Sequence, residues 1–174
     1  CMIRFRLVCL SLAVLGLGAC VTTDTPAPGS GDAARPSAAE PAWHVVLVGG
    51  DHQEKAFDNA ARRLAEGFVG AGMAPDRVHV LSALSTDPAR QPTANNIAAA
   101  LRAASASNRC FVFFTAHGTE AGLHLRSRLG NLVLSPAALD RLLRDGCGSA
   151  PSIVVMSSCH TGVFTGGAMR TANR

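Results

Sequence analysis

The stretch CFVFFT, residues 110–115, is the strongest strand signal in the chain. Its β-branched and aromatic residues follow one another without a polar break, which is typical of a strand buried on both faces of a parallel sheet. WHVVLVGG (43–50) and SIVVMS (152–157) have the same character, and RVHVLS (77–82) alternates apolar and polar residues. We therefore expect a mainly parallel sheet that contains these four strands.

Amphipathic segments separate these strands. Apolar residues recur at helical spacing from Phe57 to Ala71, which predicts a helix with one apolar face. This helix begins either near Asp51, where Asp51 and Glu54 fit a capping box, or one turn later. Gly72 fits its end.

The other two helices also have start signals. Thr93 is expected to cap a second helix, and Ser135-Pro136 opens a third, which Gly146 is expected to end. Two alternating pieces within residues 123–134 predict a hairpin around Gly130-Asn131. The resulting order of strands and helices predicts one α/β domain over residues 42–174, with helices on the faces of the sheet.

The N-terminal part of the chain does not resemble a folded domain. Residues 1–19 have a basic start and a short apolar run, and residues 17–20 (Leu-Gly-Ala-Cys) resemble the bacterial lipobox. This resemblance implies a signal peptide over 1–19 and lipidation of Cys20, with a plain secretory signal as the alternative. Residues 20–41, rich in Pro, Ala, Ser, Thr and Gly, predict a disordered linker.

Composition limits the partners that we expect. The net charge of the chain is +4, two of its basic residues precede Cys20, and aromatic residues make up 5% of it. Neither a strong positive charge nor an aromatic stacking surface is present, so we expect no nucleic-acid partner. The lipobox resemblance implies a membrane anchor, and because Val21 follows Cys20 where inner-membrane lipoproteins often have Asp, it implies the outer membrane, facing the periplasm.

Two strands end in residues that suggest chemistry. The third strand leads into His117 and Gly118, and the fourth leads into Cys159. Ligands of open α/β sheets bind at the carboxyl ends of the strands, and neighbouring strands lie about 5 Å apart. A thiol beside an imidazole is a nucleophile with its base. We therefore expect Cys159 as nucleophile, His117 as general base, and the backbone N–H groups of Gly118 and Cys159 as oxyanion donors.

The segments FFTAHG (113–118) and SCHTG (158–162) resemble the two catalytic blocks of the legumain family of cysteine peptidases. The resemblance implies a caspase-type three-layer sandwich in which the four strands have the order 2-1-3-4 and two further strands follow Arg174. It also implies hydrolysis of peptide or protein substrates without a metal or organic cofactor. Family members orient the His with an Asn after the first strand, where this chain has Asp51. Ser157 replaces an acidic residue of the family's Asn pocket, so specificity for Asn is not expected.

Other interpretations of these residues remain open. Asp51 is equally well explained as the helix cap, and a zinc site formed by His117, His124, Cys159 and His160 matches no standard spacing. The fold would also serve as a catalytically inactive binding module on a surface lipoprotein. Cys110 and Cys147 are both expected at the amino edge of the sheet. Export would place them in an oxidising compartment, so a disulfide and two buried thiols are both open.

Overall fold

The computed structural model describes residues 42–104, 109–166 and 169–170. The predicted signal peptide 1–19, the lipidation site Cys20 and the linker 20–41 lie outside these residues. The structure is therefore silent on the predicted membrane anchor, and it describes the α/β domain.

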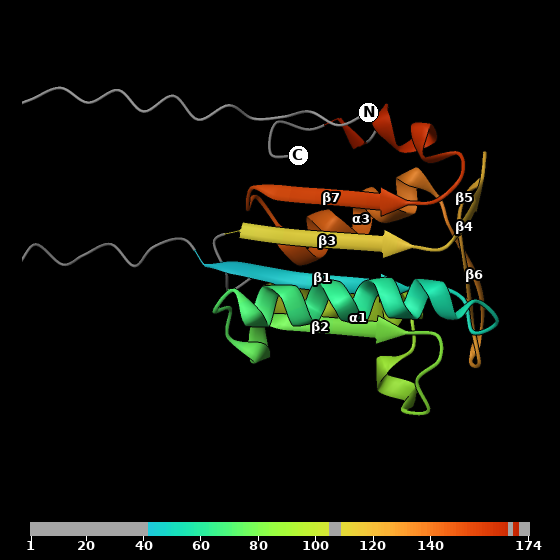
Figure 1. Cartoon of the computed structure of the whole chain (residues 1–174). Helices are drawn as coiled ribbons and strands as arrows, with labels where there is room; N and C mark the ends of the chain where they lie inside the picture. The colour runs from blue at the N-terminus through green and yellow to red at the C-terminus, as the bar shows by residue number, and fades with distance from the viewer. Residues whose placement is uncertain (1–41, 105–108, 167–168, 171–174) are drawn as a thin grey trace, which may run out of the picture. The chain divides into compact units, whose positions relative to one another are not determined.

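Four parallel strands form the centre of the domain. They are β1 (Trp43–Gly49), β2 (Val78–Ser82), β3 (Arg109–Thr115) and β7 (Ser152–Ser157), in the spatial order β2-β1-β3-β7. This is the strand order expected from the sequence, and Figure 1 shows the four arrows pointing the same way. Val112 and Phe114 of β3 are fully buried, because β3 has a strand on each side and helices over the sheet.

Helices cover both faces of the sheet. The helix α1 (Lys55–Gly70) packs on the face that carries Val45 and Leu47, whereas α2 (Ala94–Ala104) and α3 (Pro136–Cys147) contribute to the core on the other face. Successive side chains of a strand point to opposite faces, so each strand supplies both core layers. The molecule is thus an α/β domain, as the alternation of strands and helices predicts.

The helix boundaries select one of the two predicted starts of the first helix and correct the predicted end of the third. The helix α1 begins one turn after Asp51, and Glu54 caps it by accepting a hydrogen bond from the backbone N–H of Ala56 at 3.0 Å. Gly146 does not end α3, which continues to Cys147. A Cβ atom on Gly146 would lie 2.4 Å from the Cβ of Leu101, so the glycine allows α3 to approach α2 closely.

A second, antiparallel sheet stands at the carboxyl end of the parallel strands (Figure 1). It consists of β4 (His117–Thr119), β5 (Gly122–Ser127) and β6 (Gly130–Leu134). The hairpin was expected, but its turn lies at residues 128–129 and not around Gly130-Asn131. Gly130 instead begins β6 with a φ of 135°, a backbone conformation that only glycine adopts easily. No sequence pattern indicated β4.

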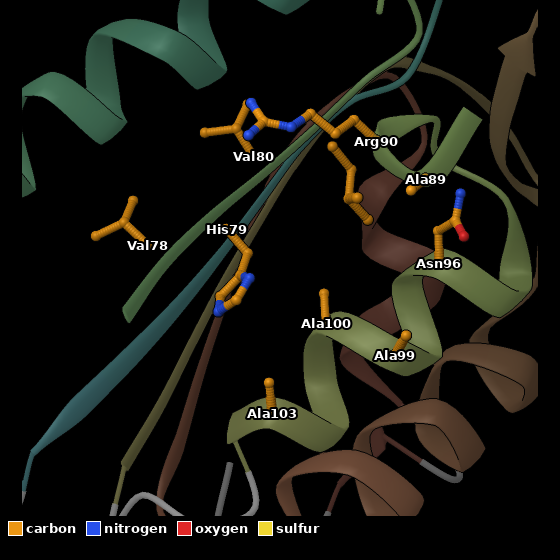
Figure 2. Close-up of a pocket in the computed structure, with 10 residues that line it drawn as sticks. Val78, His79, Val80, Ala89, Arg90, Asn96, Ala99, Ala100 and Ala103 are labelled. Atoms are coloured by element: carbon orange, nitrogen blue, oxygen red, sulfur yellow. The ribbon is translucent and has the colours of Figure 1, made fainter. Parts of the chain in front are cut away.

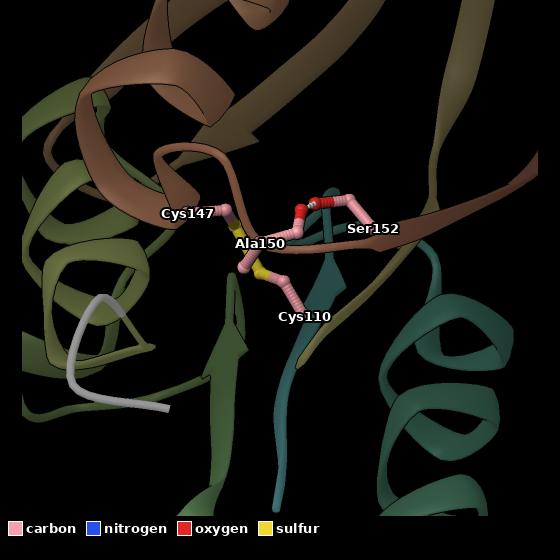
Figure 3. Close-up of a disulfide and its surroundings, with 4 residues drawn as sticks. All are labelled: Cys110, Cys147, Ala150 and Ser152. Carbon is pink, nitrogen blue, oxygen red and sulfur yellow. Dashed lines mark hydrogen bonds between the residues drawn. A yellow bond between two sulfur atoms is a disulfide. The ribbon is translucent and has the colours of Figure 1, made fainter. Parts of the chain in front are cut away.

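A disulfide closes the amino edge of the parallel sheet (Figure 3). It joins Cys110, near the start of β3, to Cys147, at the end of α3, with a Cα–Cα distance of 6.1 Å. The segment after α3 is further held by a hydrogen bond of 2.9 Å from the Ser152 hydroxyl to the Ala150 carbonyl. These contacts fix α3 to the central strand it covers.

Three short 3-10 turns complete the described residues: η1 (Pro75–Arg77), η2 (Pro88–Arg90) and η3 (Thr161–Thr165). The last of these follows β7 directly and begins just after Cys159. Within the described residues β7 pairs only with β3, and its Ile153 and Val155 side chains are 46% and 39% exposed. The strand β7 is therefore an edge with aliphatic side chains in contact with solvent.

Candidate active site

His117 lies where the two sheets meet. It follows the end of β3 by two residues and begins β4, whose antiparallel pairing places it opposite His124 of β5. Its side chain is 54% exposed, so solvent and a substrate have access to the ring. The Phe57 ring of α1 contacts it edge to face, with 5.1 Å between the ring centroids. An aromatic contact of this kind restricts the orientation of the imidazole.

Cys159 lies at the tip of a sharp turn. It follows the end of β7 by two residues, and it is an exposed cysteine with a free thiol. His160, the next residue, has a φ of 58°, in the left-handed region that costs a non-glycine residue about 1–2 kcal/mol. Strained backbone of this kind is concentrated at functional sites. The turn separates Cys159 from the strand before it and from η3 after it, and it leaves the thiol accessible.

The structure brings the two predicted loops into contact. Thr115 of β3 is in register with Ser157 of β7, and the Ala116 N–H donates to the Ser157 carbonyl at 3.3 Å. A Cβ atom on Gly118 would lie 2.3 Å from the Cys159 carbonyl oxygen. Gly118 is therefore the residue that lets the Cys159 loop pack against β4, next to His117.

Asp51 does not cap a helix but lies behind His117. Its side chain is completely buried, and its Oδ2 is 3.7 Å from Nε2 of His117. The same oxygen accepts a hydrogen bond of 2.7 Å from Nε of Arg126, and Oδ1 accepts the N–H of Gln53 at 2.8 Å. Asp51 is thus near the imidazole, but its hydrogen bonds go to other groups.

Arg126 is the site residue that sequence reasoning missed. It lies on β5, and Nη2 and Nε of its guanidinium both pair with Asp51. Its sequence signal is weak: the alternation of Leu123, Leu125 and Ser127 places Arg126 on the opposite side of the strand. That pattern indicates which side the guanidinium is on, but it does not identify a partner 75 residues away.

The pocket nearest to Cys159 along the chain is apolar. It has a volume of about 300 Å³ and lies between β7 and the segment that follows it. Its walls combine two β7 side chains with residues of and after η3: Val154, Met156, Thr161, Phe164, Thr165 and Met169. A second pocket, of about 380 Å³, lies between β2 and α2 at the other edge of the sheet, with the side chains of Arg90 and Asn96 at one end (Figure 2).

His79, which lines the second pocket, belongs to a stacked pair of histidines at the amino end of the sheet. The rings of His44 and His79 stack with 4.5 Å between centroids. Burial, followed by the charge of His79, lowers the pKa of His44 to about 4, and burial also lowers the pKa of His79. Nε2 of each ring is buried without a hydrogen-bond partner. This environment favours two neutral imidazoles.

The alternative of a zinc site at His117, His124, Cys159 and His160 has no support in the described residues. Among the residues that the structure describes, no three His, Cys, Asp or Glu side chains are placed to hold a metal ion. Nε2 of His124 is 2.8 Å from the Thr119 hydroxyl, so this nitrogen already has a protein partner.

No helix within the described part of the chain has the length and apolar character needed to cross a membrane.

Comparison with known proteins adds no relative. No protein-family model matches the chain, and no curated protein matches it. The function of this chain is therefore inferred from the geometry of its site.

Proposed function

We propose that this protein is a cysteine peptidase of caspase-type fold, with Cys159 as nucleophile and His117 as general base. The observation that supports this most directly is the packing of Gly118 against the backbone of Cys159. This contact places a free, exposed thiol on the loop that lies against the strand beginning with His117. Neighbouring parallel strands whose carboxyl ends carry a thiol and an imidazole are suited to nucleophilic catalysis.

The proposed reaction is acyl transfer. His117 takes the thiol proton, and the Cys159 sulfur forms a bond to the carbonyl carbon of the scissile peptide. The C–N bond then breaks, the amine leaves with the proton from His117, and a thioester remains on Cys159. Water, deprotonated by His117, attacks the thioester and releases the acid and the free thiol. The backbone N–H groups of Gly118 and Cys159 are the proposed donors to the oxyanion.

The setting of this activity is also part of the proposal. A lipid on Cys20 would attach the domain to the outer membrane on its periplasmic side, and the linker 20–41 would give it reach to peptide or protein substrates. Export to the periplasm agrees with the disulfide between Cys110 and Cys147, since disulfides persist in oxidising compartments.

Active-site labelling tests the proposal. The full chain is treated with a set of peptidyl acyloxymethyl ketones that differ in the residue before the electrophile, and the adduct is located by mass spectrometry. We expect covalent labelling of Cys159 that is lost in Cys159→Ala and falls at least about 100-fold in rate in His117→Ala, the usual contribution of a general base. Labelling that survives Cys159→Ala, or that no member of the set produces, contradicts the proposal.

His160→Ala is the matched control for the base. His160 is adjacent to Cys159 in sequence, but its own backbone is in the left-handed conformation and the residue is exposed. We expect its replacement to leave the labelling rate within about 3-fold of the wild type, because a surface substitution changes little. An equal loss in His117→Ala and His160→Ala would remove the assignment of His117.

One observation favours the binding module as a second candidate. Ile153 and Val155 are exposed on the edge strand β7, and the edge of a sheet offers unpaired backbone groups to an extended partner. A protein that resists all the probes but binds peptides through β7 would support this candidate. Binding that is lost in Val155→Lys would identify the surface.

A further inference from the structure

The side chains of Arg126 and His117 both approach the same oxygen atom of Asp51. Both Nε of Arg126, at 2.7 Å, and Nε2 of His117, at 3.7 Å, approach Oδ2 of Asp51. The guanidinium is within hydrogen-bond distance and the imidazole is not. A carboxylate that is completely buried needs a compensating charge, and Arg126 supplies it because a guanidinium does not lose its proton in proteins.

The backbone holds Arg126 in this position. Its N–H donates to the Gly50 carbonyl at 2.7 Å, and its own carbonyl accepts the His52 N–H at 3.0 Å. Nδ1 of His52 is also 2.9 Å from that carbonyl oxygen. These hydrogen bonds hold β5 against the segment after β1. The guanidinium therefore pairs with Asp51 without any contribution from the His117 imidazole.

We propose that Arg126 is a positioning residue that neutralises Asp51 and so keeps His117 from forming a permanent ion pair with it. This inference rests on the proposed function, since it explains how His117 stays available to take the thiol proton. A carboxylate without Arg126 at this distance would favour the imidazolium, typically by one to three pH units. An imidazolium cannot accept a proton from Cys159.

The surroundings of His117 leave Arg126 as the main source of compensation. The contacts and strand pairings around His117 involve Asp51 after β1, Arg126 and His124 on β5, and the Cys159 loop after β7. The same segments also carry His52 and the exposed His160. From α1 the contact is the uncharged ring of Phe57, and the charged residues beside it on this helix are Asp58, which pairs with Arg62, and the exposed Lys55. Arg126 is the cation that pairs with Asp51.

The test is an NMR titration of His117 in the full chain, compared among four proteins. Arg126→Gln removes the compensating charge, and we expect the titration midpoint of His117 to rise by about one pH unit or more. Asp51→Asn combined with Arg126→Gln removes both charges, and we expect a midpoint within about 0.3 unit of the wild type. Arg126→Lys keeps the positive charge but loses the planar, two-pronged hydrogen-bonding geometry of the guanidinium. We expect its His117 titration midpoint to lie between those of the wild type and Arg126→Gln.

An unchanged midpoint in Arg126→Gln, or a double variant that titrates like Arg126→Gln, overturns the inference. If circular dichroism shows that Arg126→Gln does not fold, the double variant decides, because it buries no unpaired charge. A double-variant midpoint that differs from the wild type by more than about 0.3 unit then overturns the inference. A double-variant midpoint within about 0.3 unit of the wild type, together with a raised midpoint in Arg126→Lys, supports it.

Labelling of Cys159 separates this inference from the proposed function. In Arg126→Gln the pH at which labelling reaches half its maximal rate should rise together with the His117 midpoint. If the midpoints shift as expected but no protein is labelled, the charge compensation stands and the peptidase function fails. If Cys159 is labelled but the His117 midpoints do not move, the peptidase function stands and the charge compensation by Arg126 fails.

Discussion

The two ends of the parallel sheet use the same residue types in opposite ways. At the amino end Cys110 and Cys147 are joined in a disulfide and His44 is buried, whereas at the carboxyl end Cys159 is free and His117 is half exposed. The same strand, β3, leads from one end to the other. The comparison indicates that sulfur and imidazole are structural at one end of the sheet and available for reaction at the other.

The largest expected effect is at the amino end. Replacing both Cys110 and Cys147 by Ala removes a cross-link between residues 37 apart, which we expect to lower the free energy of unfolding by about 4 kcal/mol. Urea unfolding of the full chain measures this. Cys159→Ala is the control and should change the free energy by less than about 0.5 kcal/mol. A double variant as stable as the wild type would contradict the structural role of the disulfide.

The histidines at the amino end should make the fold sensitive to acid. The pKa of His44 is lowered from 6.5 to about 4, so between these values the unfolded chain binds more protons than the folded chain. His44 therefore contributes a stability that is complete above pH 6.5 and is lost as the pH falls toward 4, by at most about 3 kcal/mol.

Thermal unfolding at several pH values measures this loss in the wild type and in His44→Leu. We expect the variant to lose less stability between pH 6.5 and 4, because it has no imidazole to protonate at this position. His79, whose pKa is lowered in the same direction, preserves part of the dependence. If stability falls equally with pH in the wild type and in His44→Leu, His44 is not responsible for the acid sensitivity.

A smaller effect is expected where the two candidate loops touch. Gly118→Ala places a Cβ atom 2.3 Å from the Cys159 carbonyl oxygen and 2.4 Å from the Ser158 hydroxyl. We expect a loss of about 2 kcal/mol in stability, typical of overpacking, and slower labelling of Cys159. Gly162→Ala is the matched control, since its Cβ would have no atom within 4 Å. Equal stability and equal labelling rates in the two variants would show that the close contact of Gly118 with Cys159 is not needed at the site.

The smallest effect concerns the turn after Cys159. His160→Gly relieves a backbone conformation with φ of 58°, and the gain of about 1 kcal/mol is partly offset by the greater freedom of glycine in the unfolded chain. We expect a change of less than about 1 kcal/mol in chemical unfolding and unchanged labelling. Loss of labelling in both His160→Gly and His160→Ala, together with retained labelling in His117→Ala, would move the base from His117 to His160.

The strands and the edge at which the candidate residues lie could be predicted from the sequence because apolar runs and their end residues are local signals. The runs at 43–50, 110–115 and 152–157 have the composition of buried strands. Once the strands are parallel, the amino ends and the carboxyl ends each share one edge. This reasoning placed His117 and Cys159 at one edge, and Cys110 and Cys147 at the other.

The features that could not be predicted depend on tertiary contacts. The strand β4 is three residues long and has no periodic signal. Gly146 looked like a helix end, but its lack of a side chain serves the contact with Leu101. The pair of Asp51 and Arg126 joins residues 75 positions apart, and a single sequence does not relate such positions. Asp51 was therefore equally compatible with a helix cap.

The distance along the chain between Asp51 and Arg126 also bears on the order of assembly during folding. Contacts between residues far apart in sequence form late, because the intervening chain must first be closed into a loop. We therefore expect the folding chain to leave His117 without the Asp51–Arg126 pair beside it until β5 has docked against the segment after β1. The active site would then be complete only after the antiparallel sheet has packed against the carboxyl end of the parallel sheet.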